Sequence, residues 1–342
     1  MLKSLFYISQ NYSFEILRPL QKEIISRGGE VRWLVIGNEV NMENFKKEED
    51  VTTDINLARN FEPQVCYVPG NVIPNFIPGI KVQVFHGLEY KKKGHFVIRG
   101  YFDLYCTHGP ATTEKFQQLA EQHGHFDVVE TGWPKLDPLF STAPYPHKSN
   151  AEKVILYAPT FSPSLTSAPE LFEQIYTLSQ QHPNWLWLIK FHPKMDKQWI
   201  NRYLTLTADN VEIVQQADIS SLLQCADIMI SDTSSVIGEF ALLNKPVITL
   251  NNSAPGDYLI DIQAADELPS AIETAFTPND RLLTAIDTYA QSLHPYVDGQ
   301  SSARILDAVE HMIEHGKSND KPKPLNLFRN LKQRKSLNYW SF

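Results

Sequence analysis

Two histidines stand directly behind apolar runs of the sequence, where they could transfer protons. The stretch "VFHGLEYKKKG" places His86 and Gly87 after such a run, and three lysines, Lys91 to Lys93, follow. An imidazole, with an ordinary pKa of about 6.5, can accept or donate a proton near neutral pH. Ammonium groups attract phosphate. The stretch therefore indicates an enzyme for a phosphorylated substrate, and a solvated lysine loop is the structural alternative.

The second histidine has a lysine beside it. In "IKFHP", Lys190 and His192 are two residues apart, and alternate residues of a strand share a face. The lysine supplies a point charge for phosphate, and the histidine can donate to a leaving oxygen. A histidine at a strand end is also common as a hydrogen-bonded structural residue. The stretch "YAPTF" leaves Thr160 at a similar strand end, with the same two interpretations.

Hydroxyl side chains open a predicted helix in "SDTSSVIGEF". A strand ends at Asp232, and Ser234 and Ser235 follow it. A helix start exposes unpaired backbone N–H groups and a partial positive charge, which together bind phosphate. Glu239 comes four or five residues later, where an acid could accept hydrogen bonds from ribose hydroxyls. The alternative is that Ser234 only caps the helix.

Two further stretches carry charged and hydroxyl side chains. "TGWPKLD" contains Lys135, and "DGQSSARI" contains Ser302 and Arg304. Taken alone, each is also typical of a turn or a helix cap. The sequence has no C-x-x-C or H-E-x-x-H spacing and no G-x-G-x-x-G or G-K-[ST] loop. We therefore expect no metal, no nicotinamide cofactor and no P-loop nucleotide.

The elements that must position these residues alternate between short apolar runs and helical patterns. Such runs predict buried strands of parallel sheets, whose ligands lie beyond the carboxyl ends of the strands. A proline-rich polar segment, 131–150, predicts a linker between two α/β domains. The predicted strands are 2–9, 31–37, 63–70, 80–87, 102–109, 153–161, 185–193, 210–214, 227–232 and 245–250. The predicted helices are 14–28, 169–181, 196–206, 218–225 and 234–243, with further helices to about 315.

Composition agrees with two globular domains. The 342 residues are 42% hydrophobic and 20% charged, and no apolar run approaches the roughly 18 residues of a membrane helix. The N-terminal stretch predicts a first strand rather than a signal peptide. The three widely spaced cysteines suit a reducing cytoplasm. We expect a first domain at 1–140, a nucleotide-binding second domain at 150–315 and a tail at 316–342.

Charge is unevenly distributed along the chain. Residues 317–342 hold seven Lys or Arg and one acid, a net charge of +6. Because the whole chain has a net charge of −8, residues 1–316 carry −14. An acidic body argues against a nucleic-acid partner. The tail also contains Phe328, Tyr339, Trp340 and Phe342, and basic residues mixed with aromatics suit an anionic membrane surface. The alternative is a frayed terminus.

The order of these motifs resembles the CDP-glycerol glycerophosphotransferase family, the teichoic-acid primase- and polymerase-like enzymes. The similarity rests on F-H-G followed by K-K-x-G, T-G-x-P-K-x-D, Y-A-P-T, K-x-H-P, S-D-x-S-S with N-K-P, and D-G-x-x-S-x-R, which span 84–305. The resemblance implies an α/β GT-B fold, with two Rossmann-like doubly wound domains facing across a cleft. It also implies that the second domain binds the CDP-alcohol donor and that the acceptor approaches from the first.

The resemblance assigns roles residue by residue. His86 matches the proposed general base, and His192 matches a histidine that contacts donor phosphate; both are expected to be catalytic. Ser234 and Ser235 match the pair that holds the diphosphate, and Glu239 matches an acid facing the ribose. Substrate contacts are expected from Gly87, Lys135, Thr160, Lys190, Ser234, Ser235, Glu239, Ser302 and Arg304.

The sequence departs from the family's pattern near the donor's alcohol end. Leu88 and Glu89 replace the common Thr-Pro, Phe161 and Ser162 replace Trp-Arg, and Lys135 replaces an arginine. The identity of the alcohol is therefore open between glycerol and a related polyol.

The expected reaction moves a polyol phosphate from a CDP-alcohol to a hydroxyl of a lipid-linked or polysaccharide acceptor, with release of CMP. Such a transfer builds a capsule or teichoic-acid-like polymer, and we expect a cytoplasmic enzyme, peripheral on the inner face of the plasma membrane. Two alternatives stay open. One is a nucleotide-sugar glycosyltransferase or a UDP-sugar 2-epimerase of the same fold. The other is a non-catalytic scaffold, which would need neither His86 nor His192.

Overall fold

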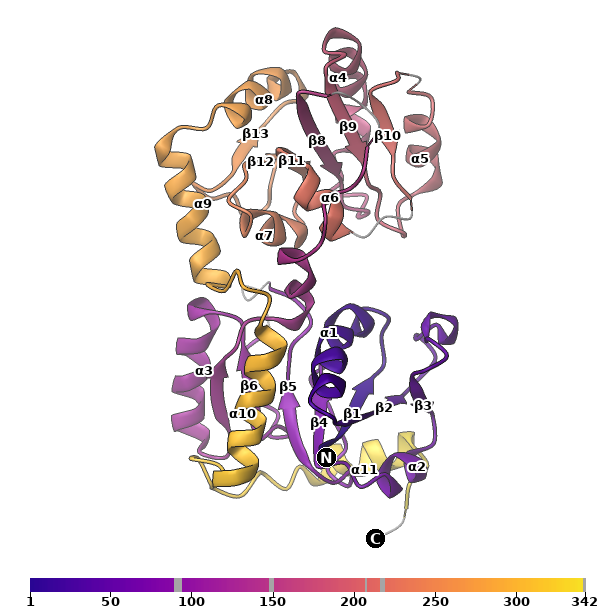
Figure 1. Ribbon diagram of the computed structural model, residues 1–342, viewed down its shortest axis with the longest axis vertical. Helices are drawn as coiled ribbons and strands as arrows, with labels where there is room; N and C mark the ends of the chain where they lie inside the picture. Colours follow the sequence, from indigo (N-terminus) through magenta and orange to yellow (C-terminus); the bar gives the residue numbers. More distant parts are fainter. Residues whose placement is uncertain (89–93, 148–150, 207, 216–218, 341–342) are drawn as a thin grey trace. The chain divides into compact units, whose positions relative to one another are not determined.

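The chain folds into two compact units. The computed structural model describes residues 1–88, 94–147, 151–206, 208–215 and 219–340, so Glu89 and the predicted phosphate-attracting Lys91 to Lys93 lie outside the described residues. The first unit comprises 1–140 together with 293–342, and the second comprises 141–292. Figure 1 labels most helices and strands of both. The chain thus enters the second unit once and then returns to the first.

The first unit is built on a sheet whose described strands are all parallel, in the order β3-β2-β1-β4-β5-β6-β7. The central strands are buried on both faces, which explains why the sequence shows them as continuous apolar runs. The edge strands β3 and β7 are short and partly exposed, so they lack that signal and were not predicted. The strands are β1 (Lys3–Ile8), β2 (Glu30–Val35), β3 (Asp50–Thr52), β4 (Val65–Val68), β5 (Ile80–Gln83), β6 (Leu104–Thr107) and β7 (Asp127–Glu130).

Helices pack on both faces of this sheet. On α1 the residues Ile16, Leu17, Leu20 and Ile24 form one buried face, as the sequence spacing predicts. Arg27, just after α1, binds Asp307 of α10 at 2.7 Å, so these two distant segments lie side by side (Figure 1). The helices are α1 (Ser13–Ser26), α2 (Ile55–Asn60), α3 (Pro110–His123), α10 (Ser301–His315) and α11 (Leu327–Ser336), with short 3-10 turns η1 (Met42–Asn44), η2 (Pro134–Leu136) and η3 (Pro138–Phe140).

The second unit repeats this architecture with parallel strands in the order β10-β9-β8-β11-β12-β13. Its core lies between the sheet and helices such as α4, α5 and α8. The strands are β8 (Lys153–Ala158), β9 (Trp185–Ile189), β10 (Val211–Ile213), β11 (Ile228–Ser231), β12 (Val247–Leu250) and β13 (Ile260–Ile262). The helices are α4 (Ala168–Gln181), α5 (Lys197–Tyr203), α6 (Ile219–Cys225), α7 (Val236–Ala241), η4 (Ala265–Glu267), α8 (Leu268–Phe276) and α9 (Asp280–Leu293).

The predicted α/β class with two parallel-sheet domains is confirmed, but two segment assignments are corrected. The predicted second domain, 150–315, is too long, because residues 293–315 belong to the first unit. The predicted linker, 131–150, is too long at its start. Residues 131–140 belong to the first unit, where the Thr131 N–H donates to the Thr107 carbonyl at 2.9 Å. In both cases long-range contacts decide the boundary.

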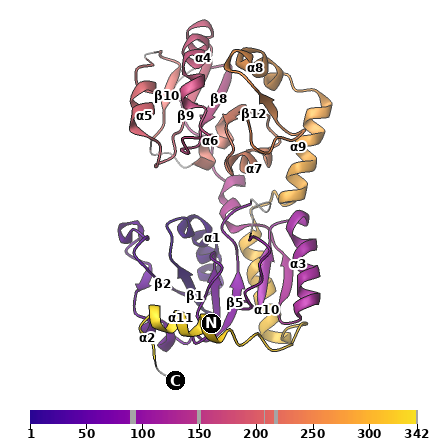
Figure 2. The same cartoon turned by 180° about the vertical axis from the view of Figure 1, so that it is seen from behind.

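The C-terminal segment is an ordered part of the first unit as far as residue 340, so a frayed terminus is wrong. Lys317 and Lys323 bind the Asp103 carboxylate at 3.2 and 2.6 Å. Tyr339 is buried and stacks on Phe76 with 4.4 Å between ring centroids. Figure 2 shows α11 beside α2 and the N-terminus. None of the described helices is both long and apolar enough to span a bilayer.

Candidate active site

His86 lies at the carboxyl edge of the first sheet, on a strained turn. The preceding residue, Phe85, is buried although its φ of +57° is in the left-handed region, which non-glycine residues rarely adopt. Strain of this kind gathers at functional sites, where the surrounding structure enforces it. Here the Phe85 ring is held in the core while the next side chain, His86, is exposed. The turn therefore presents the imidazole to solvent.

A backbone carbonyl fixes the proton of His86. The ring Nδ1 lies 3.0 Å from the carbonyl oxygen of Pro69, which follows β4. A carbonyl can only accept, so Nδ1–H is the donor and Nε2 is the nitrogen with a free lone pair in the neutral ring. Tyr12, in the loop after β1, stacks on the same imidazole at 5.3 Å. Strands β1 and β4 flank the point where the strand order reverses, which is where ligands bind in such sheets.

The other histidines near this turn are less exposed than His86. His108 directly follows β6, but it is 2% exposed and packs edge-on against Phe85. Burial holds the pKa of His108 well below its ordinary value, and burial followed by the nearby His86 lowers the pKa of His95 to about 4. Both rings are therefore neutral near pH 7. His86 is the exposed member of the cluster.

His192, in the second unit, has the opposite proton arrangement. The backbone N–H of Lys194 donates to its Nδ1 at 3.1 Å, so the neutral ring carries its proton on Nε2. Burial, and then the Lys194 ammonium, lower the pKa of His192, which favours that neutral form. Phe161 stacks on the ring at 4.4 Å. His192 is thus prepared as a hydrogen-bond donor.

Asp232 joins two of the predicted motifs. Its carboxylate accepts from the backbone N–H of Thr160 at 2.8 Å and from that of Ser167 at 3.2 Å. The side chain is fully buried, and burial raises the pKa of Asp232 to about 6. These bonds hold the loop after β8 against the end of β11. Strands β8 and β11 flank the reversal of strand order in the second sheet, so the loop lies at a ligand-binding edge.

The other residues of the second unit that were predicted to contact the donor differ in exposure and in hydrogen bonding. Ser235 is exposed and Ser234 partly exposed just before α7, which begins at Val236 rather than at the predicted 234. The Ser234 hydroxyl accepts from the Val236 N–H at 3.4 Å, whereas the N-cap residue of α7 is Ser235, which makes no side-chain capping bond. Glu239 is buried within α7. The Lys190 ammonium donates to the Gln215 carbonyl at 2.7 Å, so it bridges neighbouring strand ends.

The motifs "TGWPKLD" (131–137) and "DGQSSARI" (298–305) contact each other in the first unit. Asp137 accepts from the backbone N–H groups of Ser301 and Ser302, both at 2.8 Å, and so caps α10. Gly132 has a φ of +81°, and a Cβ there would lie 2.5 Å from the Ser301 hydroxyl. These contacts give both motifs a structural role. Ser302 and Arg304 therefore belong to the unit that holds His86, whereas the sequence-based domain limits had put them in the second.

The remaining predicted contacts also lie in the first unit. Lys135 forms an ion pair with Glu15 of α1 at 3.5 Å. Arg304 binds Asp298 and lies over the Tyr296 ring at 3.9 Å. A Cβ at Gly87 would meet no atom within 4 Å, so packing does not require glycine there. Sequence inspection missed Tyr12, the Pro69 carbonyl and the Lys194 N–H as parts of the site. Two of these are backbone groups, which no sequence motif displays.

A family comparison connects these sites to a known group of enzymes. Residues 102–311, more than half of the chain, match the model of the CDP-glycerol:poly(glycerophosphate) glycerophosphotransferase family. The chain belongs to this family. The match covers His192, Asp232 and the capped start of α10, and it begins after the turn that holds His86.

Individual relatives agree with this assignment. The chain is 30% identical over 174 residues to the teichoic acid glycerol-phosphate primase of Bacillus subtilis, covering 47% of this chain and 44% of that protein. It is 25% identical over 215 residues to the teichoic acid ribitol-phosphate polymerase TarK of Staphylococcus aureus, covering 53% and 40%. The matches thus span less than half the length of these relatives.

Solved structures establish the GT-B type of the fold. The wall teichoic acid polymerase TagF superposes with a TM-score of 0.63 at 15% identity, over 92% of this chain and 89% of that one. A UDP-N-acetylglucosamine 2-epimerase gives 0.64 at 14% identity, over 94% and 99%. At such low identity the likeness to both concerns the fold, so it does not choose between transfer and epimerisation. The family match favours transfer.

Proposed function

We propose that the chain transfers glycerol phosphate, or a related polyol phosphate, from a CDP-alcohol to a hydroxyl acceptor and releases CMP. The observation that carries the proposal is the exposed His86, whose Nδ1–H is bound to the Pro69 carbonyl. A histidine held in this way has Nε2 available as a general base. Family membership supplies the donor class, since the family is described by CDP-glycerol and poly(glycerophosphate).

In the proposed reaction, His86 Nε2 takes the proton of the acceptor hydroxyl. The acceptor oxygen forms a bond to the phosphorus that carries the polyol, and the bond from that phosphorus to the oxygen of CMP breaks. The electron pair of the broken bond leaves with CMP. Phosphoryl transfer depends mainly on positioning and on electrostatic stabilisation, which hydrogen-bond donors and lysines can supply.

The second unit is proposed to bind the donor. In this unit the Nε2–H of His192 can donate a hydrogen bond to a diphosphate oxygen. Hydrogen bonds to a charged acceptor are stronger than those between neutral groups. The Thr160 loop, held by Asp232, adds backbone and hydroxyl groups at the same sheet edge. The further donor or acceptor contacts proposed are Gly87, Lys135, Lys190, Ser234, Ser235, Glu239, Ser302 and Arg304.

We propose a lipid-linked or polysaccharide acceptor and a place on the inner face of the plasma membrane. The basic and aromatic composition of 317–342 supports the membrane association. Acceptors of this type are themselves held at or near a membrane surface, so an enzyme that docks there would meet them at a high effective concentration.

CMP release is the test. Purified protein is incubated with CDP-glycerol, CDP-ribitol or UDP-N-acetylglucosamine, together with a crude lipid or polysaccharide acceptor fraction. We expect CMP from a CDP-alcohol with the wild type, none above background with His86→Ala, and full activity with His123→Ala, an exposed histidine of the same unit. UDP release or an epimerised sugar, with no CMP from either CDP-alcohol, would overturn the proposal.

A further inference from the structure

A cavity opens at the edge of the first sheet opposite to His86. Its volume is about 630 Å³, and it is lined by the loop before β5, the residues before β6 and the C-terminal segment 317–330. Because the strands are parallel, this is the amino edge, whereas His86 follows the carboxyl end of β5. The cavity is therefore separate from the candidate active site of the same unit.

The cavity carries an excess of positive charge. Lys81, Lys317, Lys321 and Lys323 line it against two acids, Asp103 and Asp320. The Lys81 ammonium is buried and donates to the carbonyls of Ile77, Pro78 and Gly79 at 2.6, 3.0 and 2.5 Å, so a carboxylate does not neutralise it.

Within this lining, Asp103 already pairs with Lys317 and Lys323. Lys321 is exposed, and no ion pair to it is found among the described residues. Two positive charges thus remain in excess, and they favour an anion in the cavity.

An apolar ridge begins at the rim of this cavity. Leu325 lines the cavity and is 76% exposed, and Leu327, Phe328 and Leu331 of α11 are 63%, 90% and 51% exposed. We call these four side chains the α11 ridge. Arg329, Lys332 and Lys335 on the same helix are exposed as well. Contiguous exposed apolar side chains with basic neighbours are typical of helices that lie in a membrane interface.

We propose that this cavity binds the anionic phosphate of a glycerophospholipid headgroup while the α11 ridge enters the adjoining apolar layer. The inference deepens the proposed function and rests on it, because it names the surface through which the transferase meets its membrane. A free phosphate would use the cavity but not the ridge, whereas a lipid uses both. Stable anchoring needs two such signals, an apolar one and a cationic one.

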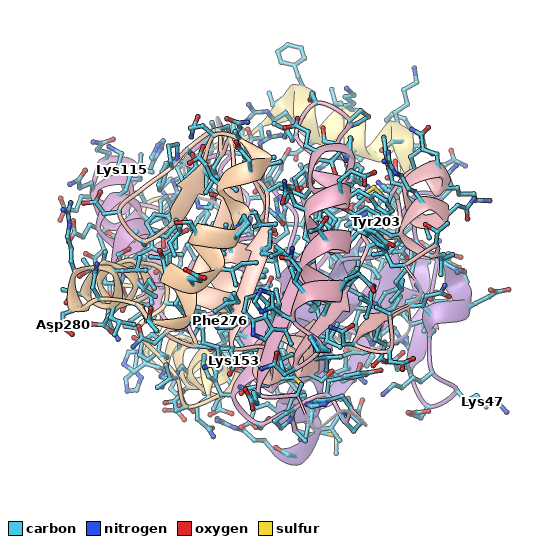
Figure 3. The ribbon with its side chains drawn as sticks, turned by 90° about the horizontal axis from the view of Figure 1, so that it is seen from above. Lys47, Lys115, Lys153, Tyr203, Phe276 and Asp280 are labelled. Atoms are coloured by element: carbon cyan, nitrogen blue, oxygen red, sulfur yellow. The ribbon has the colours of Figure 1, made fainter. Side chains whose placement is uncertain are left out.

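Vesicle binding of the full chain tests the proposal without any donor present. Vesicles of phosphatidylcholine alone are compared with vesicles that also contain phosphatidylglycerol, by co-sedimentation. We expect binding to the anionic vesicles to be at least about tenfold tighter, and Lys321→Glu and Phe328→Ala each to weaken it by about tenfold. Lys47→Glu reverses a charge on an exposed lysine of the same unit, labelled in Figure 3, and should leave binding unchanged.

Three outcomes would overturn the inference. Wild-type binding by both Lys321→Glu and Phe328→Ala would exclude the cavity and the ridge. An equal loss with Lys47→Glu would show general charge attraction. Displacement from the vesicles by soluble glycerol phosphate, with Phe328→Ala binding like the wild type, would show a site for a free phosphate.

Transferase activity keeps the two proposals distinguishable. CMP release by Lys321→Glu and Phe328→Ala with a water-soluble acceptor should equal that of the wild type, because neither residue belongs to the proposed catalytic machinery. Loss of vesicle binding with intact CMP release therefore supports the inference. Intact vesicle binding without CMP release from any CDP-alcohol would refute only the proposed function.

Discussion

The two candidate catalytic histidines have similar surroundings but opposite proton positions. Each follows a strand, and each stacks on an aromatic ring, Tyr12 for His86 and Phe161 for His192. The Nδ1–H of His86 donates a hydrogen bond to a carbonyl, whereas Nδ1 of His192 accepts one from an N–H. The backbone thus leaves one ring with a basic Nε2 and the other with an Nε2–H donor.

This difference teaches that the chemistry of a histidine is set by its partner at Nδ1. His86 follows β5 and His192 follows β9, and both lie beyond the carboxyl end of a parallel strand, so a position at a strand end does not by itself separate a base from a donor. A carbonyl and an N–H are both main-chain groups, and a change of one peptide's orientation exchanges them. The following predictions test whether the two histidines differ in this way.

Replacement of His86 should have the largest effect. A glutamine can donate and accept hydrogen bonds but is not a base, so we expect His86→Gln and His86→Ala each to lower kcat by about a thousandfold or more. Donor affinity, measured by calorimetry, should stay close to that of the wild type. Substantial activity in His86→Gln would show that the ring is not the base, and the comparison between the two histidines would fail.

Replacement of His192 should be partly reversible by glutamine. Loss of one donor to a developing charge lowers kcat by about a hundredfold to a thousandfold, which we expect for His192→Ala. The amide nitrogen of glutamine lies near the position of Nε2, so His192→Gln should recover about tenfold of that loss. Steady-state CMP release on both variants measures this. Equal activity of the alanine and glutamine variants would argue against a donor role.

The stability contributed by Asp232 should depend on pH. Its pKa is raised to about 6 in the folded state, so folding favours the protonated acid. The stability that protonated Asp232 contributes is complete below the pKa of this side chain in the unfolded chain, and it is lost as pH rises through 6. Relative to Asp232→Asn, the wild type should gain about 2 kcal/mol of unfolding free energy between pH 7 and pH 4.

Urea unfolding of both proteins across this range measures the difference. If the wild type instead loses unfolding free energy relative to Asp232→Asn as pH falls, the hydrogen bonds from Thr160 and Ser167 stabilise the carboxylate more than burial destabilises it. The carboxylate would then be the favoured form in the donor loop.

Removal of the stacked rings should have the smallest effect. An aromatic contact contributes about 0.5–1.5 kcal/mol, so Tyr12→Leu and Phe161→Leu should each lower activity by about twofold to tenfold. If the two sites differ as proposed, Tyr12→Leu lowers mainly kcat and Phe161→Leu raises mainly KM for the donor. Identical changes of kcat and KM in the two variants would argue against different roles for His86 and His192.

Much of the fold could be predicted from the sequence because buried parallel strands leave continuous apolar runs. The runs around Leu5, Val82 and Met229 all became central strands. The short edge strands β3, β7 and β13 were missed, since partly exposed strands carry mixed residues. The return of α10 to the first unit was also missed, because contacts such as those between Asp137 and Ser301 join residues 164 positions apart.

The sequence by itself determined the fold class and the family, and it identified the two histidines as candidates, because these follow from residue type and local spacing. Only the tertiary structure decided which nitrogen of each ring carries the proton, that Asp232 binds the loop of Thr160, and that the C-terminal segment docks at the amino edge of the first sheet. The physical reason is that these features depend on main-chain groups and long-range contacts. Such partners are fixed only when distant parts of the chain pack together.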